Sequence, residues 1–218
     1  MPRLIDYSSF FDAAHNAIEA KTQKRRQAVS FKRKLDIAVD SAARDEVPGD
    51  ERLRQIQHLL DNFEGFKRSA AQREFHEAFI DANLPHIYGI ADYEKYAERI
   101  LRERKIETMQ TEVLVCCPRR FGKTTSVSMF VAVMLYCVPD TWISVFSTGQ
   151  RASTTLLDQA ARFFYTLPGA KDRVIKKNQE QFFIRGVDGS DVRRFHSFPS
   201  SVAGLKGQVR NIWFTFKF

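Results

Sequence analysis

A short segment, residues 117–125, carries the side chains of this protein that are best suited to hold a phosphate group. It reads Cys-Pro-Arg-Arg-Phe-Gly-Lys-Thr-Thr and lies between two apolar runs, residues 112–117 and residues 123–136. The first run is short and β-branched and predicts a buried strand, whereas the second predicts a helix of about four turns. A tight turn from a strand into a helix directs backbone N–H groups and the positive end of the helix dipole at one point. The segment therefore predicts a phosphate-binding loop.

The residues at the end of this loop indicate which phosphate compound it would bind. Lys123 adds a mobile positive charge for β and γ phosphates, and Thr124 offers a hydroxyl to Mg²⁺. Gly122 permits a close approach of the backbone that a Cβ atom would obstruct. We therefore expect ATP and Mg²⁺ as cofactors. The common form of the motif has glycine where this chain has Cys117, and the alternative interpretation makes Lys123 an exposed lysine at a helix start.

The departure from the common motif is similar to one known family. A Pro-Arg-Arg-Phe-Gly-Lys-Thr loop without the leading glycine resembles the variant Walker A motif of large terminase subunits, the ATPases that pump DNA into capsids of tailed-phage and herpesvirus type. Residues 200–214, which include Gly-Leu-Lys-Gly-Gln, resemble the segment that leads into the Walker B strand of that family. The resemblance covers about residues 70–214. It implies an α/β fold of the P-loop NTPase class, with a mostly parallel sheet flanked by helices.

The same resemblance assigns roles to the loop residues. Arg119 stands where the family carries an arginine that reaches the γ phosphate, and such a guanidinium stabilises the charge of the transition state. Arg119 and Lys123 are therefore the expected catalytic residues, and Thr124 is the expected metal ligand. In the alternative interpretation Arg119 and Arg120 are solvated or contact DNA phosphates. The residues expected to contact the nucleotide are Cys117, Pro118, Arg119, Arg120, Phe121, Gly122, Lys123, Thr124 and Thr125.

Gln72 has two interpretations. Terminases and related helicase-like ATPases recognise adenine with a glutamine upstream of the phosphate loop, so the resemblance implies that Gln72 contacts the base. A carboxamide matches the donor and the acceptor on the edge of adenine. Alternatively, Ser69-Ala-Ala-Gln72 is a capping box, in which the glutamine bonds back to the N–H of the helix cap. The sequence leaves both open.

The last residues lack the acids that the family uses for hydrolysis. In terminases the strand that would begin near Asn211 ends in two acids, which orient Mg²⁺ and the attacking water. Here Phe216 and Lys217 stand at about those positions. We therefore expect the N-terminal part of a terminase-like motor, truncated near the Walker B strand, that binds ATP and hydrolyses it slowly or not at all. The alternative is a non-catalytic P-loop protein that binds nucleotide and DNA as a regulatory or assembly factor.

The pattern of elements predicts a division of the chain near residue 108. Residues 1–107 are expected to form a helical region, with helices beginning near Phe10, Asp50, Ser69 and Asp92 and a stop at Leu84-Pro85. Residues 108–218 are expected to form an incomplete P-loop ATPase core. Within that core the pattern predicts a strand at 141–147, a helix at 151–167 and a hairpin at 181–185 and 191–197.

Composition and charge indicate the class of partner. The 218 residues are 44% hydrophobic and 28% charged, which suits a folded chain, and the net charge of +8 favours a polyanion such as double-stranded DNA. Residues 21–34 hold seven basic side chains and no acid; they are a nuclear localisation signal, a DNA contact or the solvated side of a helix. The resemblance adds a viral portal or procapsid, a small terminase subunit and a homo-oligomeric ring as partners.

The sequence also argues against membrane insertion and disulfide chemistry. The longest apolar run, residues 127–138, is well below the roughly 18 residues that a membrane span requires. The three cysteines lack metal-binding spacing, and no secretory leader opens the chain, so we expect reduced thiols. We expect an intracellular location in an infected host, which is the nucleus for a herpesvirus-like protein and the cytoplasm for a phage-like one.

Overall fold

The computed structural model describes residues 47, 49–118, 120–147, 149–199 and 212–216. Several predicted features lie outside these residues: the helix start near Phe10, the basic run 21–34, Arg119, most of the segment 200–214, and Lys217. The described residues from Val47 onward belong to one compact unit. The division near residue 108 stays a prediction.

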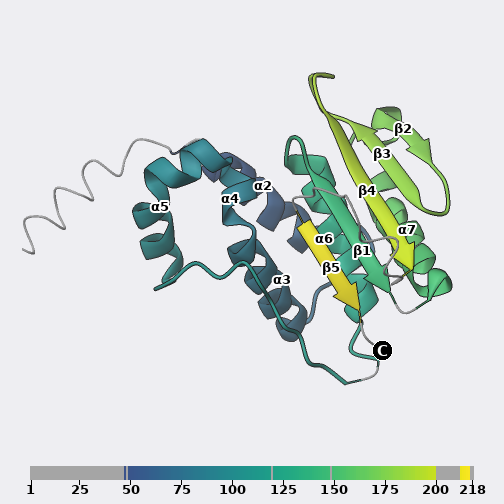
Figure 1. The fold of residues 1–218 in the computed structure, drawn as a ribbon, viewed down its shortest axis with the longest axis horizontal. Helices are drawn as coiled ribbons and strands as arrows, with labels where there is room; N and C mark the ends of the chain where they lie inside the picture. Colours follow the sequence, from purple (N-terminus) through teal and green to yellow (C-terminus); the bar gives the residue numbers. More distant parts are fainter. Residues whose placement is uncertain (1–46, 48, 119, 148, 200–211, 217–218) are drawn as a thin grey trace, which may run out of the picture. The chain divides into compact units, whose positions relative to one another are not determined.

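The described part of the chain combines helices with one mixed sheet (Figure 1). The helices are α2 (Asp50–Asp61), α3 (Ala70–Ala82), α4 (Leu84–Tyr88), α5 (Ile90–Arg104), α6 (Lys123–Cys137), α7 (Gln150–Tyr165) and a 3₁₀ turn, η1 (Lys171–Arg173). The strands are β1 (Trp142–Ser147), β2 (Val174–Lys177), β3 (Gln181–Arg185), β4 (Val192–Pro199) and β5 (Ile212–Phe216). The predicted α/β class is confirmed.

The sheet has a parallel half and an antiparallel half, and the prediction of a mostly parallel sheet is therefore wrong. The strand order is β2-β3-β4-β1-β5, in which β1 pairs in parallel with both β4 and β5, whereas β3 pairs antiparallel with β2 and β4. The carboxyl ends of β4, β1 and β5 therefore lie at one edge of the sheet. In open α/β sheets this edge is where ligands commonly bind.

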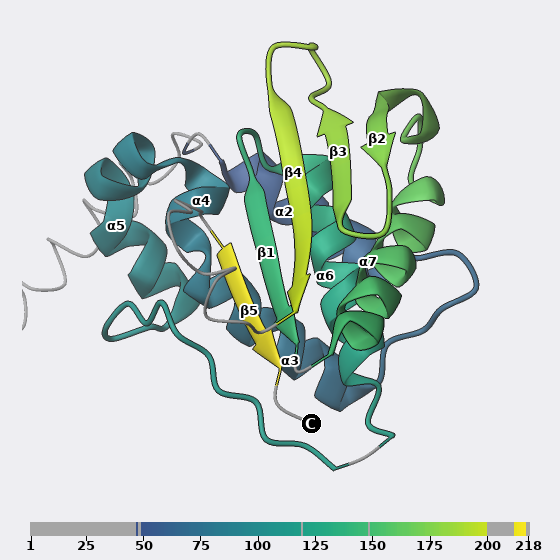
Figure 2. The same ribbon diagram turned by 45° about the vertical axis from the view of Figure 1, so that its right-hand side comes forward.

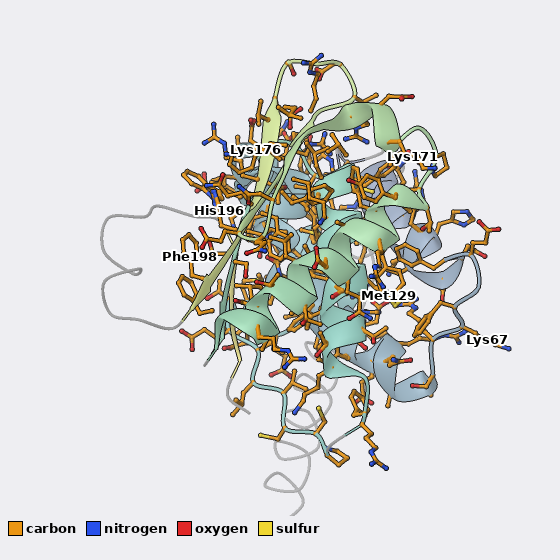
Figure 3. The ribbon with its side chains drawn as sticks, turned by 90° about the vertical axis from the view of Figure 1, so that its right-hand side faces the viewer. Lys67, Met129, Lys171, Lys176, His196 and Phe198 are labelled. Carbon is orange, nitrogen blue, oxygen red and sulfur yellow. The ribbon has the colours of Figure 1, made fainter. Side chains whose placement is uncertain are left out.

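Helix α6 is the centre of the core. Every residue from Ser126 to Leu135 is buried, because the sheet and α7 lie on one side of α6 while α2 and α3 pack on another. In the nearly edge-on view of Figure 3, Met129 lies on the helical side of the sheet, and His196 and Phe198 lie on the opposite side. A helix that is apolar around its whole circumference is stable only when it is enclosed in this way. Its position also fixes where the predicted phosphate loop must lie.

A polar network fixes the far end of α6. Arg193 of β4 is buried and donates hydrogen bonds to the carbonyl oxygens of Leu135 (2.9 Å) and Tyr136 (2.6 Å), and it pairs with Asp191 at 2.8 Å. Burial alone would raise the pKa of Asp191. Hydrogen bonds from Arg193 and from the Asp140 backbone N–H lower this pKa by more than burial raises it, so the net shift is downward. The Asp191 carboxyl is therefore ionised at pH 7, and Arg193 caps the last carbonyls of the helix.

Several local predictions are confirmed. The helix that starts at Lys123, the strand over Trp142–Ser147, helix α7 and the hairpin of β3 and β4 all form close to the predicted bounds. The stop at Leu84-Pro85 is also confirmed, since the helix that follows Ser69 ends at Ala82 with Asn83 as its C-cap. A separate short helix, α4, then begins at Leu84, because proline is well tolerated in the first turn, where its missing N–H is not needed.

The strand predicted at residues 112–117 is wrong. This segment is extended but unpaired within the described part of the chain, and its side chains alternate: Val113 and Val115 pack against the core, whereas Leu114 is 91% exposed. A strand needs a neighbouring backbone to accept and donate its hydrogen bonds, and apolar alternation alone does not supply one. The predicted phosphate loop therefore follows an unpaired segment and not a strand of the sheet.

Candidate phosphate-binding site

The chain bends sharply before α6. The helix begins at Lys123 after Gly122, whose φ of 90° and ψ of 25° lie in the left-handed region. Arg120 also has a positive φ, 68°, and the N–H of Phe121 donates to the carbonyl of Pro118 at 3.4 Å. A left-handed backbone costs a residue with a Cβ about 1–2 kcal/mol, and such strained residues gather at functional sites. Successive turns of this kind direct neighbouring N–H groups into one concavity.

The beginning of α6 is open toward this bend. The first N–H with a partner inside the helix is that of Ser126, which donates to the carbonyl of Gly122 at 2.9 Å. No side chain caps the helix start, and the first turn holds no acid. The N–H groups of Lys123, Thr124 and Thr125 thus precede the helical ladder at the positive end of the dipole. Figure 2 shows the chain entering α6 at the end toward which the arrows of β1 and β5 point.

The side chains of the first turn are partly accessible. Lys123, Thr124 and Thr125 are each half-buried, and the hydroxyl of Thr125 accepts a hydrogen bond from Gln159 Nε2 of α7 at 3.1 Å. This contact ties the first turn of α6 to α7. The Thr124 hydroxyl fits one ligand position of Mg²⁺, an ion that commonly takes its remaining ligands from water, carboxylates and the phosphates of its nucleotide. The described residues contain no cluster of three His, Cys, Asp or Glu side chains able to hold a metal.

The remaining predicted loop residues have different environments. Cys117 and Phe121 are half-buried, and Pro118 and Arg120 are exposed. Arg119, the predicted catalytic arginine, lies outside the described residues. The structure thus brings Gly122, Lys123, Thr124 and Thr125 together at the helix start, and the catalytic role of Arg119 stays a prediction.

Helix α3 lies beside the bend that precedes α6, and Gln72 is the residue of α3 next to Gly122. The predicted capping box forms: the Gln72 N–H donates to Ser69 Oγ at 3.2 Å, and the Ser69 N–H donates to Gln72 Oε1 at 3.0 Å. The other end of the carboxamide approaches the loop, since an ideal Cβ built on Gly122 would lie 3.1 Å from Gln72 Nε2. Bidentate recognition of adenine would require Oε1, which the cap uses. Base recognition by Gln72 therefore stays a prediction.

His76 connects α3 to α6, and the sequence analysis predicts no role for this residue. Its ring is fully buried, with Nε2 at 2.8 Å from the carbonyl oxygen of Ser126 and Nδ1 at 2.9 Å from Arg68 Nη1. Arg68 is itself buried and pairs with Asp61 at 2.7 Å. Burial lowers the pKa of His76 to about 4, and the positive charge of Arg68 contributes to this, although the hydrogen bond to Ser126 opposes it. The imidazole is therefore neutral at pH 7.

One signal in the sequence could have pointed to His76. Gln72 and His76 are four residues apart, so on a helix they occupy the same face. If Gln72 lies beside the loop, then His76, one turn later on the same face, must lie close to the first turn of the following helix.

Comparisons with known proteins leave the site to be interpreted from its own residues. No protein-family model matches this chain, and no curated protein matches it either. None of the helices in the described residues combines the length and apolar character that a membrane crossing requires.

Proposed function

We propose that this protein binds ATP with Mg²⁺ at the bend between Pro118 and Thr125. The observation that carries the proposal is the open start of the buried helix α6: an uncapped first turn follows a left-handed glycine and begins with Lys123 and Thr124. Anions bind at such helix starts through backbone N–H groups. The flanking lysine and threonine are the side chains that a triphosphate and its magnesium ion require.

Four residues at the helix start, 122–125, each have a defined part in this proposal. The N–H groups of Lys123, Thr124 and Thr125 would donate to phosphate oxygens, and the Lys123 ammonium would contact the outer phosphates. Gly122 fits the backbone close to the ligand, because a side chain there would both strain the backbone and approach Gln72. The bound nucleotide would supply the phosphoanhydride bond, and its phosphates together with water would supply further oxygen ligands for Mg²⁺.

The proposed biological class is a DNA-packaging motor of the large terminase type with a P-loop ATPase core. Support comes from the resemblance of the Pro-Arg-Arg-Phe-Gly-Lys-Thr loop and of residues 200–214 to that family, and from the net charge of +8. In this proposal the partners are double-stranded DNA, a portal or procapsid, a small terminase subunit and further copies of the large subunit in a ring. The site of action is inside the infected host cell.

A second candidate function is nucleotide binding without hydrolysis. It is favoured by β5, which follows the segment that resembles the approach to Walker B but reads Ile-Trp-Phe-Thr-Phe and contains no carboxylate. Hydrolysis needs a group that orients water and ligands that hold Mg²⁺. We therefore propose that this chain alone binds ATP and turns it over very slowly.

Calorimetric titration of the purified chain with ATP and Mg²⁺ tests the binding proposal. Lys123→Ala should weaken binding about tenfold to a hundredfold, which corresponds to the loss of one charge-assisted hydrogen bond. Lys171→Ala is the matched control, because it removes the same charge from η1, next to the far end of α6, where Arg173 Nη2 donates to the carbonyl of Tyr136. The two lysines are thus separated by about 20 Å, the length of α6. Equal affinities of the two variants would refute the site, and rapid steady-state hydrolysis would refute the non-catalytic proposal.

A further inference from the structure

We infer that α3 is a positioning element for the phosphate loop, with His76 as the residue that holds the first turn of α6 in place. The inference rests on the proposed function, since it assigns to α3 the control of how the loop presents its N–H donors. It differs from a role of Gln72 in base recognition, because the contact is made with the loop and the helix and requires no contact with the nucleotide.

The geometry that supports this inference comes from one face of α3. The carboxamide of Gln72 lies beside Gly122, near enough that an ideal Cβ on this glycine would come within 3.1 Å of Nε2. One turn later, His76 Nε2 lies 2.8 Å from the carbonyl oxygen of Ser126. The two side chains flank residues 123–125, whose N–H groups open the helix. Movement of the first turn relative to α3 would have to break the hydrogen bond of His76 or displace Gln72.

The hydrogen bonds of His76 define its tautomer. Arg68 can only donate, so Nδ1 of His76 must accept and Nε2 must carry the proton. That proton is then donated to the Ser126 carbonyl. Asp61 holds Arg68 at 2.7 Å from the other side, and thus the ring is fixed by a chain of charge-assisted bonds that begins at the surface.

The arrangement is costly if packing is its only purpose. Within the described residues, Arg68 Nε and Ser126 Oγ are buried without a hydrogen-bond partner, and each such group costs about 1–3 kcal/mol. An apolar side chain could fill the same space without burying a cation and an imidazole. What the polar chain adds is direction, because it sets the distance and angle of α6 relative to α3. Binding sites for phosphate depend on such precision, since a shift of about 1 Å can cost roughly a hundredfold in function.

Affinity for ATP with Mg²⁺ in three variants tests the inference. His76→Ala should lower affinity at least tenfold, whereas His76→Gln should stay within about threefold of the unmodified protein, because the amide can donate to Ser126 and accept from Arg68. Phe182→Leu is the stability control: Phe182 is fully buried on β3 and its ring packs against Phe164 and Tyr165 of α7. It should lower the free energy of unfolding by about 1–3 kcal/mol and leave affinity unchanged.

The outcomes separate this inference from the proposed function. Absence of binding by the unmodified protein overturns both. The positioning role alone is overturned if the affinity of His76→Ala for ATP stays within threefold of that of the unmodified protein. It is also overturned if Phe182→Leu weakens binding as much as His76→Ala does.

A second measurement covers the case in which His76→Ala does not fold. The imidazole ¹⁵N resonances of His76 in the unmodified protein should show the neutral Nε2–H tautomer at pH 6 and should shift when ATP and Mg²⁺ saturate the site. Resonances of another tautomer, or resonances that do not move, would overturn the inference.

Discussion

Replacing His76 by glutamine should change how the stability of the protein depends on pH. In the folded chain the pKa of His76 is lowered from 6.5 to about 4, because the ring is buried, with a further contribution from Arg68. The unfolded chain therefore binds a proton at a higher pH than the folded chain does. Acid thus favours unfolding through this residue, and glutamine, which does not titrate, removes the effect.

The size of the effect follows from the two pKa values. Above pH 6.5 the imidazole is neutral in both the folded and the unfolded chain, so His76 does not change the free energy of unfolding. Below about pH 4 it is protonated in both, and the loss of stability reaches a plateau. Between these limits the free energy of unfolding falls by up to about 1.4 kcal/mol per pH unit. Lowering the pH from 7 to 5 should therefore cost the unmodified protein about 2 kcal/mol more than it costs His76→Gln.

Urea unfolding of both proteins at pH 7 and pH 5 measures this difference. All other titrating groups are shared, so their contributions cancel in the comparison. The unmodified protein should lose about 2 kcal/mol more on acidification than the variant loses. Equal losses would show that folding leaves the pKa of His76 unchanged, and would refute the buried Arg68–His76–Ser126 chain.

Three other substitutions test separate parts of the structure. Gly122→Ala places a Cβ on a backbone with φ 90° and at 3.1 Å from Gln72 Nε2, so it should lower the free energy of unfolding by about 1–2 kcal/mol and weaken ATP binding. A calorimetric titration showing unchanged affinity would contradict the proposed phosphate site. Gly186→Ala would place a Cβ 1.5 Å from Asp191 Oδ1, displacing this carboxylate from the buried Arg193, and should cost about 3–5 kcal/mol; a loss below about 1 kcal/mol in urea unfolding would mean that Asp191 moves freely. Leu114→Lys should change stability by no more than about 0.5 kcal/mol, since Leu114 is 91% exposed, and a larger loss in the same assay would indicate that residues 112–117 pair in the sheet after all.

The parts of the fold that follow from local pattern could be predicted from the sequence. Helix α6 follows a glycine and is mostly apolar, and the hairpin of β3 and β4 surrounds Asp188-Gly189, so each is specified by residues close together in the chain. The capping box of Ser69 and Gln72 is local for the same reason. These features need no knowledge of the tertiary structure.

The features that depend on distant partners could not be predicted. Residues 112–117 form a short, β-branched apolar run as a buried strand does, but pairing requires a second backbone, and no sequence pattern shows whether one lies alongside. His76 contacts Ser126, which is 50 residues later, and the contact arises only because α3 packs on α6. Most of the site can therefore be inferred from the loop, but the support beneath it cannot.

The backbone amide resonances of Lys123, Thr124 and Thr125 test the central claim most directly. On addition of ATP with Mg²⁺, these three amides and that of Gly122 should show the largest chemical-shift changes in the chain, and Lys123→Ala should reduce the changes at equal ligand concentration. Amides that remain unchanged at saturating nucleotide, or changes centred on another part of the chain, would contradict a phosphate-binding bend at the start of α6.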